Sequence, residues 1–271
     1  MKPYQEIKKY TESNRKAWNQ TMPIHQKSNK NKWDTSFSTE GFSALGANEL
    51  NDLLKIGITG KNIAHLCCNN GVELMSIKSL GANRCVGFDI SELAVEEASS
   101  RCSNFGINCE FIQADVYDIP ESYHEKFDLV YLSAGCIGWL PDLSSFFNKV
   151  SLLLNEKGHL YMHEIHPFSE MLPTDDNTDS DPLTIIEPYF KEEPYEDCEG
   201  IDYIGKTKYE SEKSYWFVWK ISDIINSIIN NEMFLLEMIE YPNDISACHN
   251  RNMNAGVPVP LSYSMIARKS C

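Results

Sequence analysis

Residues 62–89 constrain the fold more than any other part of the chain, because strand-like and helix-like patterns alternate there around a tight turn. Residues 62–67 form a short apolar run, and residues 69–71 (Asn-Asn-Gly) have turn chemistry. Residues 72–80 carry apolar side chains at helical spacing until Gly81 ends them, and a second apolar run ends at Asp89. This order predicts half of a nucleotide-binding unit, in which a helix N-terminus faces the ligand.

The spacing of Gly71 and Asp89 separates two kinds of ligand. Asp89 lies 18 residues after Gly71, close to the spacing of about 20 at which such units place a carboxylate on ribose hydroxyls. A dinucleotide's pyrophosphate also needs the G-x-G-x-x-G turn, and this chain lacks it. The pattern therefore disfavours an NAD(P) site.

Three later segments follow in order. Residues 109–115 (CEFIQAD) indicate a strand that ends in an acid, residues 127–133 (FDLVYLS) a further strand, and residues 152–161 (LLLNEKGHLY) a helix end, a Lys-Gly turn and a strand. Over about residues 60–165 the chain resembles the class I S-adenosylmethionine-dependent methyltransferases, and more closely their small-molecule branch. In that family's acid-x-G-x-G-x-G turn, His65 stands at the acid, Cys67 and Asn69 at two glycines, and Gly71 at the third.

The resemblance implies an α/β fold with a Rossmann-like sheet of about seven strands, the last antiparallel, and helices on both faces. Residues 221–231, 233–241 and 261–268 supply a helix and two strands for its second half. We predict an N-terminal helical extension (residues 1–50), a cofactor-binding core (51–166), an acidic aromatic insertion (167–215) and the C-terminal part of the sheet (216–271).

The same resemblance implies that S-adenosylmethionine is bound and S-adenosylhomocysteine released. It assigns the turn at residues 67–71 to the methionine end, Asp89 to the ribose, and Asp115 with the Val116 amide to the adenine. Aspartates at these turns could instead act as caps. The expected cofactor-binding residues are Cys67, Asn69, Gly71, Asp89, Ile90, Asp115, Val116, Ser133 and Ala134.

His166 ends the fifth predicted strand, at the edge of the sheet where open α/β proteins bind ligands. It is the candidate catalytic residue, to orient an acceptor or remove its proton, unless it only caps the strand. With His163 and Glu164 it forms H-E-x-H. Histidines three apart on a strand point to opposite faces, so we expect no metal site there.

The insertion is acidic, broken by prolines and rich in aromatic side chains. It is either a lid over the acceptor or a segment held on the sheet edge by its rings. The N-terminal segment resembles the extension that packs across the cofactor opening, although Trp18 could equally anchor a helix in the core. His25 and Trp33 lie in loop-like sequence. The expected substrate-binding residues are Trp18, His25, Trp33, His166, Tyr189 and Trp216.

Composition bounds the partners and the location. The chain has 24 basic and 39 acidic residues, a net charge of −15, which repels phosphate backbones and anionic membranes. We expect a small-molecule acceptor and neither a nucleic-acid nor a membrane partner, and we interpret the basic residues 27–32 (KSNKNK) as a solvated loop. Nine cysteines without a C-x-x-C pair, and an N-terminus without an apolar core, predict reduced thiols and a cytoplasmic protein.

Three alternatives stay open. An NAD(P)-dependent oxidoreductase could use a related sheet, and the altered glycine turn fits a regulatory protein that binds S-adenosylmethionine or a nucleotide without catalysis. The cysteines could hold an arsenic acceptor, as in arsenic-methylating relatives. No motif names the atom that is methylated or the oligomeric state.

Overall fold

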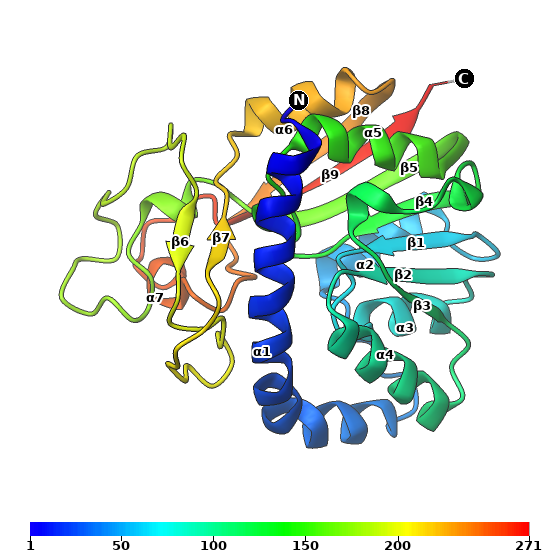
Figure 1. Ribbon diagram of the computed structural model, residues 1–271, viewed down its shortest axis with the longest axis horizontal. Helices are drawn as coiled ribbons and strands as arrows, with labels where there is room; N and C mark the ends of the chain where they lie inside the picture. The colour runs from blue at the N-terminus through cyan, green and yellow to red at the C-terminus, as the bar shows by residue number, and fades with distance from the viewer. Residues whose placement is uncertain (271) are drawn as a thin grey trace.

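A computed structural model describes residues 1–270, without the side chains of residues 30 and 31. At its centre is a seven-stranded sheet with the order β3-β2-β1-β4-β5-β9-β8 (Figure 1). Strands β1 to β5 are parallel, and β9 is antiparallel to both β5 and β8. The predicted sheet, with its antiparallel final strand, is therefore confirmed. The strands are β1 (Ile63–Leu66), β2 (Cys85–Asp89), β3 (Glu110–Gln113), β4 (Phe127–Leu132), β5 (Leu154–Ile165), β8 (Met233–Tyr241) and β9 (Ser262–Lys269).

Helices cover both faces of the sheet because its central strands are apolar on both sides. In β4, Val130 and Leu132 pack toward one face, with Phe146 of α5. Leu129 and Tyr131 alternate to the other face, where helices α2 and α3 lie. The helices of the core are α2 (Ala47–Ile56), α3 (Val72–Ser79), α4 (Glu92–Phe105), α5 (Leu143–Leu153) and α6 (Ile221–Ile229), with 3₁₀ turns η1 (Val116–Asp118), η2 (Glu121–Tyr123) and η3 (Ile137–Trp139).

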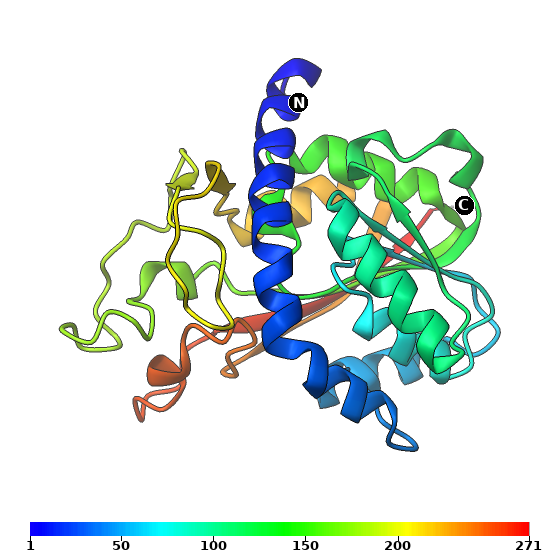
Figure 2. The same cartoon turned by 60° about the horizontal axis from the view of Figure 1, so that its bottom comes forward.

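Helix α1 (Tyr4–Phe37) runs between the sheet and the insertion, as both views show (Figures 1 and 2). Figure 2 shows that it changes direction along its length, and the helix contains Pro23, which removes a backbone hydrogen bond. Residues 27–32 belong to this helix, so their interpretation as a loop was wrong. Tertiary contacts override the weak helix propensity of that segment: Trp33 and Phe37 pack against Phe42, with ring centroids 6.4 and 5.1 Å apart.

The insertion contains η4 (Ser169–Met171) and a small antiparallel sheet of β6 (Tyr195–Asp197) and β7 (Ser214–Trp216). Asn14 of α1 joins it: its side chain donates to the Tyr215 carbonyl (3.0 Å) and accepts from the Tyr215 amide (2.7 Å). A short helix, α7 (Asn250–Met253), lies beside it (Figure 1). The division at residues 50, 166 and 215 stays a prediction, although α2 and β7 each cross one of these boundaries.

No helix within residues 1–270 has both the length and the hydropathy needed to cross a membrane.

Candidate active site

The turn after β1 keeps a left-handed path although only one of its three glycine positions holds glycine. The backbone φ is 54° at Cys67, 46° at Asn69 and 74° at Gly71. At Gly71 a Cβ atom would overlap the ring of Phe111, so space as well as φ requires glycine there. Cys67 and Asn69 adopt the same region with side chains, at a cost of roughly 1–2 kcal/mol each. Loss of two glycines has therefore not changed the path of the turn.

Asp89, at the end of β2, braces this turn. Its Oδ2 accepts a hydrogen bond from the Asn69 amide (2.7 Å) and its Oδ1 accepts one from the Ser91 amide (2.9 Å). Burial raises the pKa of Asp89 to about 6, although these amide donors act against the rise. Each carboxylate oxygen has two lone pairs, so Asp89 can still accept hydrogen bonds from a ligand's hydroxyl groups.

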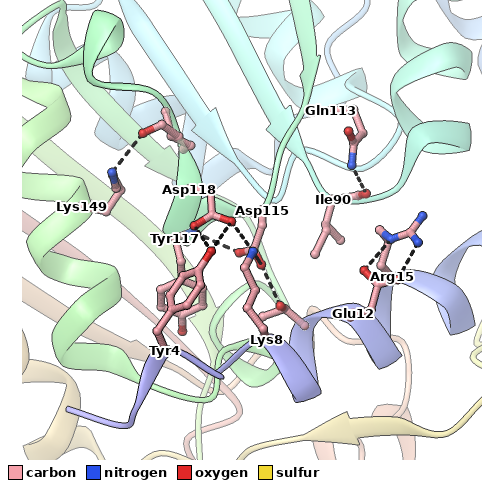
Figure 3. A network of polar contacts seen from close by, with 12 residues as sticks. Tyr4, Lys8, Glu12, Arg15, Ile90, Gln113, Asp115, Tyr117, Asp118 and Lys149 are labelled. Atoms are coloured by element: carbon pink, nitrogen blue, oxygen red, sulfur yellow. Dashed lines mark hydrogen bonds and ion pairs between the residues drawn. The ribbon is translucent and has the colours of Figure 1, made fainter. Parts of the chain in front are cut away.

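Asp115, after β3, is held by side chains of α1. Its Oδ2 accepts hydrogen bonds from Thr11 Oγ1 and from Lys8 Nζ, both at 2.7 Å. Lys8 also pairs with Asp118, and Figure 3 shows its ammonium between the two carboxylates. Burial lowers the pKa of Lys8, but the hydrogen bonds with the two aspartates outweigh it and leave that pKa raised. The ion pairs fix α1 over this edge of the sheet.

The loop after β4 is shaped by Glu164, a buried residue of β5. Its Oε2 accepts from the Gly135 amide (2.8 Å) and its Oε1 from the Ile137 amide (2.9 Å). Burial raises the pKa of Glu164 to about 7, against the effect of these donors. This buried carboxylate holds the loop that carries Ser133 and Ala134 at the carboxyl end of β4.

His65 stands where the family turn has an acid. Its ring is buried in β1, and its Nε2 lies 3.1 Å from Ser133 Oγ. Burial lowers the pKa of His65 to about 3, so the imidazole is neutral near pH 7. A neutral ring therefore replaces a carboxylate behind the turn.

These segments meet at a cavity of about 760 Å³ at the carboxyl edge of the sheet, lined also by α1 and the insertion. Parallel strands place their carboxyl ends together, which explains why residues far apart in the sequence meet here. The cavity is lined by the predicted cofactor residues Cys67, Asn69, Asp89, Ile90, Asp115, Val116, Ser133 and Ala134, and by the predicted substrate residues Trp18, His25, Trp33 and Trp216. Gly71 lies behind this lining, as the N-cap of α3.

His166 lies outside the described lining of the cavity. Its Nδ1 accepts from the Phe168 amide (3.0 Å), and its Nε2 lies 2.9 Å from Glu240 Oε1. Burial lowers the pKa of His166, with Glu240 acting against this. Both nitrogens are thus engaged in shaping the chain after β5, and this geometry does not support the expected catalytic or substrate-binding role.

Tyr189 also lies outside the described lining. Its hydroxyl accepts a hydrogen bond from the Ile221 amide (3.3 Å), at the start of α6. The ring therefore joins the insertion to the core instead of facing the cavity. His25 and Trp33 do line the cavity, but from a helix and not from the loop that the sequence suggests.

Sequence reasoning did not select several residues of the site, four of which matter for its chemistry. Trp139 of η3, Glu170 of η4 and Tyr203 of the insertion line the cavity, and Glu164 supports the loop beside it. Glu164 carried a signal, since a lone acid in a buried apolar strand needs partners. The other three follow strands or lie in irregular segments, where no periodic pattern predicts orientation.

Within the described chain, no group of three or more His, Cys, Asp or Glu side chains is arranged to hold a metal ion.

Comparison with known proteins identifies the family. A family model described as "Methyltransferase domain" (Methyltransf_31) matches residues 59–212, more than half of the chain. The rRNA N(6)-adenosine-methyltransferase METTL5 of Danio rerio is 38% identical over 77 residues, 28% of this chain and 37% of that protein. The chain thus spans little more than a third of the length of this curated relative.

Solved structures share the fold. One from Listeria monocytogenes, provisionally identified as an S-adenosylmethionine-dependent methyltransferase, superposes with a TM-score of 0.62 and 19% identity over 83% of this chain and 98% of that one. An S-adenosylmethionine-dependent methyltransferase from Mesorhizobium loti superposes with a TM-score of 0.61 and 21% identity, over 83% of this chain and 99% of that one.

The cavity residues fit the methyl donor: a backbone turn after β1 opens α3, a carboxylate stands at the end of the neighbouring β2, and another follows β3. The family match disfavours the NAD(P)-dependent oxidoreductase. The chain belongs to the methyltransferase-domain family, in which S-adenosylmethionine is the methyl donor, and it has the Rossmann-like fold of the class I enzymes.

Proposed function

We propose that this enzyme methylates a small molecule inside the cavity at the carboxyl edge of the sheet. The observation that carries the proposal is the cavity itself: its volume of about 760 Å³ lies in the range of small-molecule sites, and α1 and the insertion contribute to its walls. The predicted donor-binding residues line one part of it, and Trp18, Trp139 and Trp216 line another.

The residues of the donor site take separate roles in this proposal. The backbone of residues 67–71 holds the methionine end, Asp89 accepts hydrogen bonds from the ribose hydroxyls, and Asp115 with the Val116 amide receives the adenine. Bound S-adenosylmethionine supplies a methyl group that its sulfonium already activates. Ser133 and Ala134 border the acceptor, on the loop that Glu164 fixes.

The protein's contribution is then mainly orientation and exclusion of water. An acceptor held in line with the reacting bond gains from reduced translational freedom, and a dry site favours reaction of the positively charged donor. Contacts of α1 with Asp115 and with Tyr215 of β7 connect the donor side to the insertion. We therefore propose the insertion as part of a lid over the acceptor.

RNA is the second candidate acceptor, because the METTL5 relative carries rRNA in its name. Charge argues against it for this chain. The net charge is −15, and Lys32 is the one Lys or Arg among the described residues that line the cavity. Binding of RNA depends on basic groups that neutralise phosphates.

A labelling experiment separates these acceptors. The full chain is incubated with trideuteromethyl S-adenosylmethionine and either total RNA or a low-molecular-weight metabolite extract, and products are analysed by mass spectrometry. We expect a small metabolite to gain about 17 mass units, because one trideuteromethyl group replaces a hydrogen atom. Heat-denatured protein is the control, and label found only in RNA would refute the proposal.

We also propose a reducing, cytoplasmic location. Cys67, Cys136 and Cys248 line the cavity as free thiols, and a reducing compartment keeps such groups from oxidation.

A further inference from the structure

One end of the cavity is walled by aromatic rings that touch in series. The centroids of Trp216 and Trp139 are 4.9 Å apart, and those of Trp139 and Trp18 are 5.3 Å apart, both pairs edge to face. Tyr203 continues the series 6.4 Å from Trp18 and 4.7 Å from His25. The rings come from α1, η3, β7 and the insertion, so the complete fold is needed to assemble this aromatic wall.

The carboxylate of Glu170 lies in the same wall. Its Oε1 accepts a hydrogen bond from Trp216 Nε1 at 3.1 Å, which orients the group beside the rings. Burial raises the pKa of Glu170, with the Trp216 hydrogen bond and nearby His249 acting in the opposite direction. No described Lys or Arg forms an ion pair with Glu170, and even a half-buried carboxylate without a cation is costly. A positively charged ligand would remove that cost.

Lys32, also in the lining, is occupied elsewhere. Its ammonium lies over the ring of Trp33, 4.6 Å from the centroid. A carboxylate beside ring faces is the chemistry that recognises ammonium groups, since both attract positive charge. The function proposed above does not use Glu170 for the donor, because the cationic methionine end is assigned there to the turn at residues 67–71, the ribose to Asp89 and the adenine to Asp115.

We propose that the methyl acceptor is an amine, whose nitrogen is bound between Glu170 and the rings of Trp18, Trp139 and Trp216. This assignment rests on the function proposed above. In the transfer, the nitrogen lone pair forms the new N–C bond, the C–S bond breaks, and its electron pair stays on sulfur. Positive charge thus moves from sulfur to nitrogen, and the aromatic wall with Glu170 stabilises the ammonium product. The acceptor reacts as the neutral amine, so the proton of its ammonium form leaves to solvent before the transfer.

Glu170 and the rings make the site selective by charge as well as by shape. A hydroxyl acceptor gives a neutral product once its proton is lost, so the carboxylate would gain no partner from it. The ratio of the affinities for a cation and for a neutral molecule of the same shape therefore tests the proposal directly.

The test uses two probes of nearly equal shape, choline and its neutral carbon isostere 3,3-dimethyl-1-butanol. Their binding to the full chain is followed by tryptophan fluorescence with saturating S-adenosylhomocysteine, whose own affinity is measured first by calorimetry. We expect choline to bind at least about tenfold more tightly than the alcohol, because the alcohol has no positive charge to pair with Glu170. A tenfold ratio corresponds to about 1.4 kcal/mol of binding free energy.

Glu170→Gln should reduce this preference to within about threefold while the affinity for S-adenosylhomocysteine stays within about twofold. Glu192→Gln is the matched control, since it removes the same charge from an exposed position of the insertion, and it should leave the preference intact. Trp216→Phe removes the indole donor to Glu170 and should weaken choline more than the alcohol. This second variant tests the wall independently if Glu170→Gln melts at a much lower temperature.

Equal affinities for the two probes, or no binding of choline, would overturn the amine assignment and leave the methyltransferase function standing. A wild-type protein that does not bind S-adenosylhomocysteine would instead overturn the proposed function, and the amine assignment with it.

Discussion

If Asp89 binds the ribose as proposed, the affinity for S-adenosylhomocysteine should depend on pH between 5 and 7. Its pKa is raised to about 6 by burial, so the group is about 90% ionised at pH 7 and about 10% ionised at pH 5. Only the ionised form accepts from both ribose hydroxyls without a competing proton. Protonation should therefore weaken binding about tenfold between pH 7 and pH 5, close to 1.4 kcal/mol.

The raised pKa has the opposite effect on stability. The folded protein holds its proton up to about pH 6, whereas the unfolded chain releases it near 3.8, so the folded state binds more protons between these values. The contribution of Asp89 to stability is therefore largest below pH 3.8 and falls as pH rises through 6, by about 3 kcal/mol in total. Ligand hydroxyls that bind the carboxylate offset part of this loss.

Calorimetric titration at a series of pH values from about 5 to about 8.5, which spans both pKa values, provides the assay, with Asp89→Asn as the comparison. Glu73 lines the same cavity, and burial raises its pKa to about 7, so wild type should show two steps. Asp89→Asn cannot ionise and should lose only the step near pH 6. The ratio of the two affinities then isolates Asp89, and Asp179→Asn, an exposed site, should behave as wild type. A ratio that does not change with pH would refute the reasoning.

Three further substitutions test the supports of the site. Gly71→Ala should lower the unfolding free energy, measured in urea, by about 3 kcal/mol, because the new Cβ atom adds left-handed strain and overlaps the ring of Phe111. Gly57 has a similar φ but open space around it, so Gly57→Ala should cost only about 1 kcal/mol. Equal losses for the two variants would contradict this reasoning. Glu164→Ala leaves two loop amides unpaired and should cost about 3 kcal/mol in the same assay, and a loss below about 1 kcal/mol would show that the loop holds itself. Thr11→Val removes a buried hydrogen bond to Asp115 and should cost about 1 kcal/mol; unchanged stability would mean that this bond does not help to dock α1.

The sequence predicted best the parts that depend on local periodicity. Buried apolar runs such as β1 and β4 are typical of strands in a sheet whose two faces are covered by helices, so the order of the core and the acids after β2 and β3 could be predicted. The turn at residues 67–71 was harder, because Cys67 and Asn69 replace glycine. Its path is kept by Asp89, which accepts from the Asn69 amide, and by Gly71, which has no Cβ atom to overlap the ring of Phe111.

Long-range contacts decided the rest. Residues 27–32 are polar and have weak helix propensity, yet they are helical because Trp33 and Phe37 pack on Phe42. His166 ends β5 at the expected edge, but its direction depends on Glu240, 74 residues later in the chain. A strand pattern predicts which edge a residue occupies and not which distant partner its side chain binds.

The position of α1 explains why the donor and acceptor parts of the cavity should act together. Lys8 and Thr11 bind Asp115 on the donor side, Asn14 binds the backbone of Tyr215, and Trp18 stands in the aromatic wall, all on one helix. A ligand that orders Asp115 therefore favours the docked helix, and the docked helix favours the aromatic wall. Such coupling is reciprocal, so an acceptor bound at the aromatic wall should strengthen donor binding by the same factor by which the bound donor strengthens acceptor binding.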